Sequence, residues 1–255
     1  MTWNDLTPHQ QREIIHALHH ETDEQQQMLS LIRALLMKKN TWFDYYRMRK
    51  TLRNTPISNL VEQLQFLNEK PTLYEFPHIK GLQAPAPRMG DITIEQYALC
   101  DTLYHRYLPP LTPPEEGNAP FPLERAGVRH LRQLVACIYR LPGKGFDKQL
   151  LPQVAKNTDL LPVKELQRIA FIFFCIKLYI ADSYPSIFKP KTLPADDAPV
   201  FGKKQQHTPF SQIIVIMAAD ELRLLGNLNE CKKTLLYDFF SAFLESRKIH
   251  KQQEK

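Results

Sequence analysis

The sequence predicts a mainly α-helical protein, a multi-helix bundle with proline-rich connectors and a C-terminal helical hairpin. Apolar side chains recur at helical spacing in four blocks, at residues 92–108, 131–141, 166–180 and 210–246. The chain also contains twenty prolines and only eight glycines. Strand-and-turn folds normally use glycine for positive-φ turns, whereas prolines can delimit helices. With 43% hydrophobic residues in 255, the chain can bury a large core.

The first seventy residues are predicted to form an N-terminal helical layer. Thr7 can cap the first helix, and Pro8 fits its first turn. In the second helix, the apolar side chains fall on one stripe, at spacings of three, four, seven and eight. The second, third and fourth predicted helices span residues 23–39, 41–52 and 57–68.

Residues 71–183 are predicted to form a central helical core with an extended connector. The connector is at 71–88, where four prolines interrupt any regular series of backbone hydrogen bonds. Thr93 and Gln96 have the spacing of a capping box, which predicts a helix start. The central helices are predicted at 93–108, 123–139 and 163–180, and an irregular proline-rich loop is predicted at 109–122.

The last part of the chain is predicted to be a linker at 184–207 followed by a C-terminal helical hairpin at 208–255. Thr208 can cap the first helix of the hairpin, with Pro209 in its first turn, and Gly226 suits a left-handed helix stop. A second helix is predicted from residue 230 to about residue 248.

The cysteines and the N-terminal residues indicate a reducing compartment. Cysteines 100, 137, 175 and 231 lie singly in apolar stretches, without the close pairing that zinc and redox motifs need, so we expect them to be buried. Residues 1–20 lack a basic region followed by an apolar run. The most apolar run, 169–180, is too short to cross a bilayer. We therefore expect a cytoplasmic protein without a membrane partner.

No motif in the sequence predicts catalysis, so we expect no enzymatic activity and no cofactor. His16 and His20 lie four residues apart, with Glu13 and Glu24 on nearby turns, which could place two imidazoles and a carboxylate around a metal. The HExxH order of metalloproteases is absent. The alternative is a polar, solvated helix face, and we predict no metal site.

A nucleic-acid interface is a second hypothesis for function. The formal net charge is +6, and cations concentrate at residues 38–53 and 247–255. In the first of these clusters, Phe43, Tyr45 and Tyr46 interleave with the cations and could stack on bases. The alternatives are that both clusters are ordinary solvated faces and that these aromatic residues belong to the core. The residues predicted to bind nucleic acid are Lys38, Lys39, Trp42, Arg47, Arg49, Lys50 and Arg53.

Four stretches of the sequence form a recognisable pattern: the helix start at 92–97 with Asp101, the segment 131–142, the apolar helix ending near Tyr179, and the C-terminal stretch 209–239. Through them, residues 90–250 resemble a class of phage and prophage proteins encoded among tail genes. This resemblance implies a non-enzymatic tail-assembly protein or tail chaperone that shields an apolar tail component. Aromatic residues and arginine dominate protein interfaces, and all the candidates except Arg140 have a core alternative. The resulting candidates for partner contact are Tyr97, Tyr104, Tyr139, Arg140, Phe239, Phe240 and Phe243.

Overall fold

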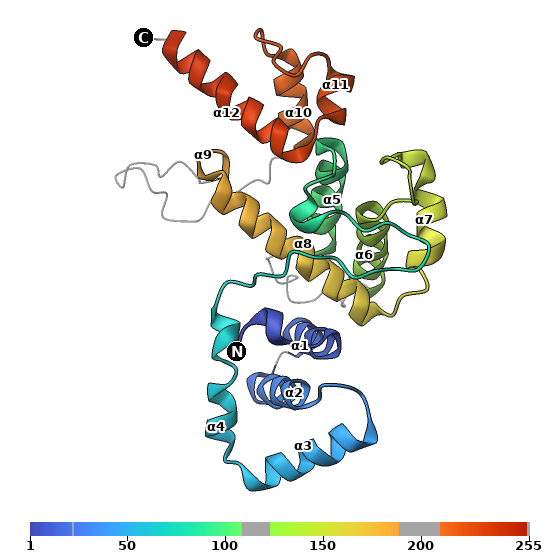
Figure 1. Ribbon diagram of the computed structural model, residues 1–255, viewed down its shortest axis with the longest axis vertical. Helices are drawn as coiled ribbons and strands as arrows, with labels where there is room; N and C mark the ends of the chain where they lie inside the picture. Colours follow the sequence, from blue (N-terminus) through green and yellow to red (C-terminus); the bar gives the residue numbers. More distant parts are fainter. Residues whose placement is uncertain (22, 109–122, 189–209, 254–255) are drawn as a thin grey trace, which may run out of the picture. The chain divides into compact units, whose positions relative to one another are not determined.

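The computed structural model describes residues 1–21, 23–108, 123–188 and 210–253, and its regular structure is helical (Figure 1). This confirms the predicted mainly α-helical fold. Within those ranges no β-strand forms, and the extended backbone makes only isolated bridges, between Gln83 and Arg140 and between Thr93 and Leu235. No helix in those ranges is both long enough and apolar enough to span a bilayer.

The chain forms two compact units, each made of two separate stretches of sequence. The first unit contains residues 1–77 and 159–175, and the second contains residues 78–158 and 176–255. Helix α8 (Val163–Ser183) therefore contributes its beginning to the first unit and its end to the second. The sequence analysis divides the chain into four consecutive segments. The two units group residues by spatial contact rather than by order along the chain, so the division into four segments stays a prediction.

The first unit begins with helices that start at capping residues, of which Thr7 was predicted. Thr7 caps the first of them in a full capping box with Gln10, while Asp23 and Thr41 cap the next two. In Figure 1, α1 and α2 lie side by side, and α3 and α4 also contact α2. The helices are α1 (Pro8–His20), α2 (Glu24–Leu36), α3 (Trp42–Asn54) and α4 (Ile57–Glu62).

The helix predicted at 57–68 is wrong in its second half. Helix α4 ends at Glu62, and a 3₁₀ turn follows at Gln65–Asn68. Leu64 and Phe66 are both buried, yet residues two apart point to different sides of an α-helix. The tighter turn resolves this conflict by changing the direction of the chain between them.

In the core of the first unit, the N-terminal residues pack against α8. The indole of Trp3 packs against the rings of Phe66 and Phe171, with ring centroids 5.5 Å and 4.8 Å away. Polar side chains also connect α1 to its neighbours. The buried Gln10 amide donates a hydrogen bond of 2.5 Å to the carbonyl of Leu35, at the end of α2. This contact satisfies one of the carbonyls that a helix end leaves without an intrahelical partner.

The second unit is built around the packing of α5 against α6. Thr93 caps α5, as predicted, by accepting a hydrogen bond from the Gln96 amide nitrogen. The predicted return bond of the capping box does not form. The Gln96 side chain instead donates to the carbonyls of Cys137 and Ile138, at 2.9 and 3.0 Å. The helices in this unit up to α8 are α5 (Ile94–Tyr107), α6 (Leu123–Ile138) and α7 (Leu151–Thr158), of which the sequence analysis missed α7.

The C-terminal hairpin contains three helices where two were predicted. The first ends at Ala219 rather than near residue 225, and the second is divided at Thr234. At that division, the Ile94 amide donates to the Thr234 carbonyl at 2.9 Å, and the Leu236 amide donates to the Ile92 carbonyl at 3.0 Å. Backbone groups used in this way cannot continue a helical ladder. Over residues 210–253 the helices of the hairpin are α10 (Phe210–Ala219), α11 (Leu228–Lys233) and α12 (Leu236–Gln253), and α9 (Pro185–Phe188) precedes them in the chain.

Two predicted connectors fall largely or wholly outside the described residues. The loop predicted at 109–122 lies entirely outside them. The linker predicted at 184–207 lies outside them except for its first five residues, in which α9 forms. The extended connector at 71–88 is described, and its backbone bridge to Arg140 is isolated rather than part of a sheet.

Candidate nucleic-acid interface

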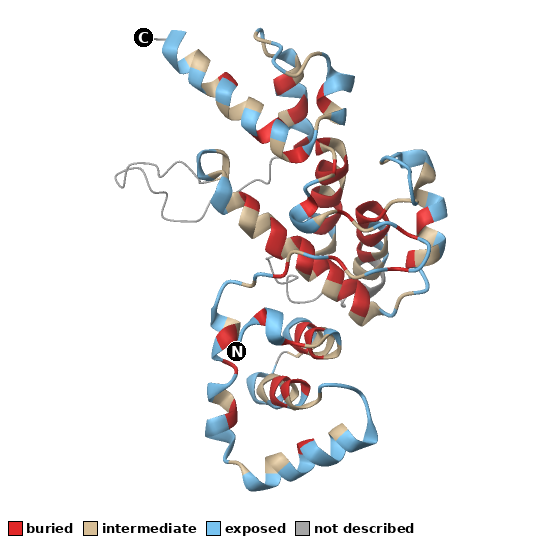
Figure 2. Cartoon of the chain, in the orientation of Figure 1, coloured by how far each residue is buried: buried red, intermediate tan, exposed pale blue. Residues whose placement is uncertain are grey.

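Helix α3 leaves most of its surface open to solvent (Figure 2). Met48 is its one buried residue, at 5% exposure. By contrast, Trp42 is 80% exposed, Phe43 61% and Tyr46 56%. Tyr45 is exposed as well. The alternative that these aromatic side chains form part of the core is therefore wrong.

Local sequence makes this segment helical although it buries so little. The Thr41 hydroxyl accepts a hydrogen bond from the Asp44 amide, and it donates one of 2.8 Å to the Asp44 carboxylate. The same carboxylate accepts from the Lys39 amide at 3.2 Å. Asp44, the only acidic residue of α3, is thus used in the cap at the helix N-terminus, where negative charge is favourable.

The helical repeat separates α3 into two faces. At about 3.6 residues per turn, positions 42, 46, 49, 50 and 53 fall within an arc of about 100°. Asp44, Met48 and Thr51 fall on the opposite side and are buried or half-buried. The outward arc carries, in chain order, Trp42, Tyr46, Arg49, Lys50 and Arg53. We call this set the α3 face.

The α3 face has an aromatic half followed by a basic half. In the aromatic half, the rings of Trp42 and Tyr46 stack with their centroids 6.1 Å apart and their planes inclined by 21°. The basic half is an open depression lined by Tyr46, Arg49, Lys50, Arg53 and Asn54. No acidic side chain lines this depression, so its electrostatic potential is set by cations.

In the part of the chain that the structure describes, the cations of α3 have no carboxylate partners. Among the described residues, none of Arg47, Arg49, Lys50 and Arg53 forms an ion pair. Two of them instead lie over aromatic rings of the same helix. The Arg47 guanidinium is 5.7 Å from the Phe43 ring centroid, and that of Arg49 is 5.2 Å from the Tyr45 ring centroid. These distances suit cation–π contacts, which pre-order guanidinium groups while leaving their hydrogen-bond donors available.

The predicted nucleic-acid residues are therefore brought together on or next to one helix. Lys38 and Lys39 lie in the exposed loop that leads into α3. Sequence reasoning named Tyr46 only as an interleaved aromatic residue and did not name Asn54. The sequence contained the signal for Tyr46, because it lies four residues after Trp42 and residues four apart on a helix are neighbours.

The second basic cluster of the sequence is arranged differently. In α12, Lys248 pairs with Glu245 at 3.0 Å. Arg247 donates a hydrogen bond of 3.0 Å to the Ser186 carbonyl and lies over the Phe243 ring. Here Lys248 has a carboxylate partner and Arg247 has a backbone carbonyl partner, whereas the α3 cations form no ion pair among the described residues. The α3 cluster is thus the better candidate for contact with a polyanion.

The residues predicted to contact a protein partner lie mostly inside the second unit. Phe243 is half-buried. Arg140 pairs with the Asp91 carboxylate and donates to the Asp91 carbonyl at 3.1 Å. In this structure the buried candidates belong to the core, as the core alternative predicted. The buried members are Tyr97, Tyr104, Tyr139, Phe239 and Phe240.

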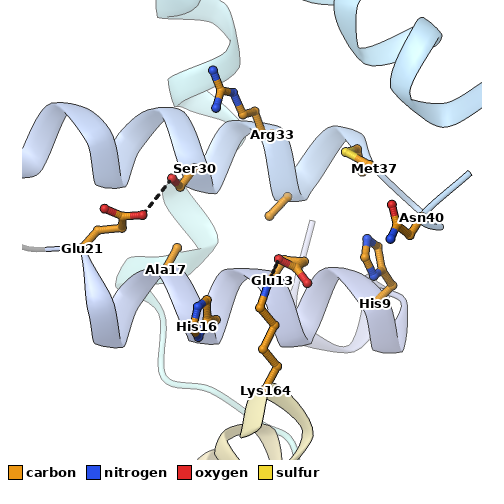
Figure 3. A pocket seen from close by; sticks show the side chains of 11 residues that line it. His9, Glu13, His16, Ala17, Glu21, Ser30, Arg33, Met37, Asn40 and Lys164 are labelled. Carbon is orange, nitrogen blue, oxygen red and sulfur yellow. Dashed lines mark hydrogen bonds and ion pairs between the residues drawn. The ribbon is translucent and has the colours of Figure 1, made fainter. Parts of the chain in front are cut away.

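A polar pocket between α1 and α2 is lined by Glu13 and by His16, one of the two histidines considered as metal ligands; His20 is not part of its lining (Figure 3). Glu13 is paired with Lys164 at 2.6 Å. The amide of Gln167 bridges the two imidazoles, at 2.9 Å from His16 Nδ1 and 2.7 Å from His20 Nε2. Across the described residues, no three His, Cys, Asp or Glu side chains are placed to hold a metal ion. The pairing of these side chains is structural, because it connects α1 to α8.

The four cysteines are free and buried, as predicted. Burial raises the pKa of the Cys175 thiol to about 12 and that of the Cys100 thiol well above its ordinary value. A thiol is nucleophilic as its thiolate, which these environments disfavour. The described cysteines are therefore placed as small core side chains.

Comparison of the chain with protein-family models, curated proteins and solved structures finds no significant match.

Proposed function

We propose that this protein binds nucleic acid through the α3 face. The observation that carries the proposal is the row of exposed cations at Arg49, Lys50 and Arg53, which have no carboxylate partner among the described residues and lie next to exposed aromatic rings. A surface cleft lined by cations attracts a polyanion, and a phosphate backbone supplies the opposite charge. The positive net charge of the chain favours the same class of ligand.

The proposal is tested by fluorescence anisotropy with a labelled oligonucleotide. The full chain is compared with a variant carrying Arg49→Ala, Lys50→Ala and Arg53→Ala. We expect this variant to bind at least about tenfold more weakly, since a loss of only about 1.4 kcal/mol has that effect. A matched control removes three exposed cations from α11 and α12 through Lys233→Ala, Lys248→Ala and Lys251→Ala. Equal affinity of the two triple variants would refute the assignment to α3.

A second candidate is the tail-assembly role implied by the resemblance, acting through a different surface from the one first expected. A largely apolar groove between α5, α10 and α11 is lined by Leu99, Ile214, Val215 and Leu228. Next to it, Ile216 is 61% exposed. Such a groove suits an apolar helix of a tail component. Co-expression with the products of neighbouring genes tests this role, and a Val215→Asp variant should abolish any complex that uses the groove.

A further inference from the structure

The aromatic half of the α3 face points to a particular form of nucleic acid. We propose that the ligand is single-stranded, that its bases stack on Trp42 and Tyr46, and that its phosphates bind Arg49, Lys50 and Arg53. This inference rests on the proposed function and adds to it the strandedness of the ligand and separate roles for the two halves of the face.

The exposed rings are suited to stacking on unpaired bases. Trp42 and Tyr46 are held nearly parallel one helical turn apart, and both are more than half exposed. Their i, i+4 spacing places both rings beside the same stretch of a bound strand. Stacking on aromatic side chains is the usual way in which proteins hold single strands without reading their sequence.

A duplex fits the same face poorly. Its bases are already stacked and paired, so the rings could reach them only by unstacking or flipping, which is energetically costly. Base edges in the major groove are read by hydrogen-bonding side chains, arginine most often. Here the first half of the face carries the Trp42 and Tyr46 rings instead, so a duplex bound to Arg49 and Arg53 would leave both rings without a base to stack on.

The order of the two halves along α3 matches a strand that runs along the helix. From residue 42 to residue 53 the helix axis is about 16 Å long, at about 1.5 Å per residue. This length accommodates a few nucleotides, so bases at one end and phosphates at the other belong to one short segment of strand. The cations are in the last turns of the helix, where its dipole also favours positive charge.

An acidic peptide is the competing polyanion. It would satisfy the cations, but carboxylates offer the rings nothing to stack upon. The face also lacks an aliphatic pocket for an apolar anchor, since the depression beside Tyr46 is lined otherwise by Arg49, Lys50, Arg53 and Asn54. Exposed rings next to exposed cations thus favour a ligand that has both flat faces and negative charge.

Tryptophan fluorescence tests this inference directly, because the chain contains only two tryptophans and they differ in exposure. Trp3 is 4% exposed, whereas Trp42 is 80% exposed. Four ligands are added to the full chain in separate titrations. They are oligothymidylate, the duplex of the same strand with oligoadenylate, an abasic strand, and polyglutamate. We expect the single strand to bind most tightly and to quench fluorescence, and the Trp42→Phe variant to show little quenching. Trp42→Ala should weaken single-strand binding by roughly tenfold, as expected for the loss of one stacked base.

The possible results separate the inference from the function on which it rests. Duplex binding as tight as single-strand binding, without quenching, would overturn the single-strand inference and leave nucleic-acid binding in place. Equal affinity for abasic and thymidylate strands would refute base stacking. Polyglutamate binding as tight as that of oligothymidylate would overturn this inference in favour of an acidic protein partner. Binding of none of the four would refute both this inference and the proposed function. Circular dichroism of Trp42→Ala confirms that any loss of binding occurs in a folded protein.

Discussion

The ring of Trp42 stacks on that of Tyr46 one helical turn later, and both rings remain exposed to solvent. An i, i+4 aromatic pair contributes only a few tenths of a kcal/mol to an isolated helix. The fold therefore gains little from two of the largest side chains in the chain. Their exposure makes them available to a ligand, and it leads to a direct prediction about stability.

Trp42→Ala should leave the free energy of unfolding within about 0.5 kcal/mol of the wild-type value, because exposed substitutions rarely change it more. Met48→Ala, on the buried side of the same helix, should lower it by about 2–5 kcal/mol. Urea unfolding followed by circular dichroism measures both. A larger loss for Trp42→Ala than for Met48→Ala would mean that the aromatic ring supports the fold.

Gln96→Ala should destabilise the second unit. The buried Gln96 side chain donates to the carbonyls of Cys137 and Ile138, at the end of α6. Without it, those carbonyls lose their partner, at a cost of about 1–3 kcal/mol. Gln133→Ala, at an exposed position of α6, is the control and should be close to neutral. Equal unfolding midpoints for the two variants in urea would disprove this role of Gln96.

The ion pair between Asp101 and Lys177 should behave as a buried pair. Asp101 is 1% exposed, and its Oδ1 lies 2.5 Å from the Lys177 Nζ. Lys177→Met leaves the buried carboxylate without its lysine and should cost about 3–5 kcal/mol. Adding Asp101→Ala should recover part of that loss. A double-mutant cycle measures the coupling, and additive effects of the two substitutions would contradict the pairing.

Asp220 should make stability depend on pH in the acidic range. A hydrogen bond from Ser246 and further ones from His250 and the Leu222 amide lower the pKa of this carboxyl below its ordinary value of 3.8. A lowered folded-state pKa gives stability that is present above the unfolded value and is lost as the pH falls through the folded value. Ser246→Ala should therefore raise the pKa of Asp220 and flatten the decline in stability below about pH 4. Carboxyl chemical shifts followed through an acid titration measure this pKa, with Ser241→Ala as the control. An unchanged pKa in Ser246→Ala would contradict the assignment.

The helical fold was predictable because its signals are local. Thr7 and Thr93 cap the helices that their sequence positions predict. Local signals fail where distant backbone groups compete. The break at Thr234 depends on a hydrogen bond to Ile94, about 140 residues earlier in the chain, and no periodicity near residue 234 reveals it.

The candidate site was predictable in its residue types but not in its exposure. Cations and aromatic residues alternate through residues 38–53, and the sequence pattern is equally consistent with aromatic side chains turned inward. Which side of α3 is covered depends on how α2 packs against it, and in this fold Met48 is buried and Trp42 is open to solvent. For the same reason, Tyr97 and Phe240 could be proposed as contact residues although the tertiary fold buries them.

The salt dependence of oligonucleotide affinity tests the central claim most directly. For a single strand, the logarithm of the binding constant falls with the logarithm of the salt concentration by about 0.7 for each phosphate neutralised. If Arg49, Lys50 and Arg53 each contact a phosphate, their combined replacement by alanine should reduce the magnitude of the slope by about 2. An unchanged slope in this triple variant, or a wild-type affinity that does not vary with salt, would contradict the account.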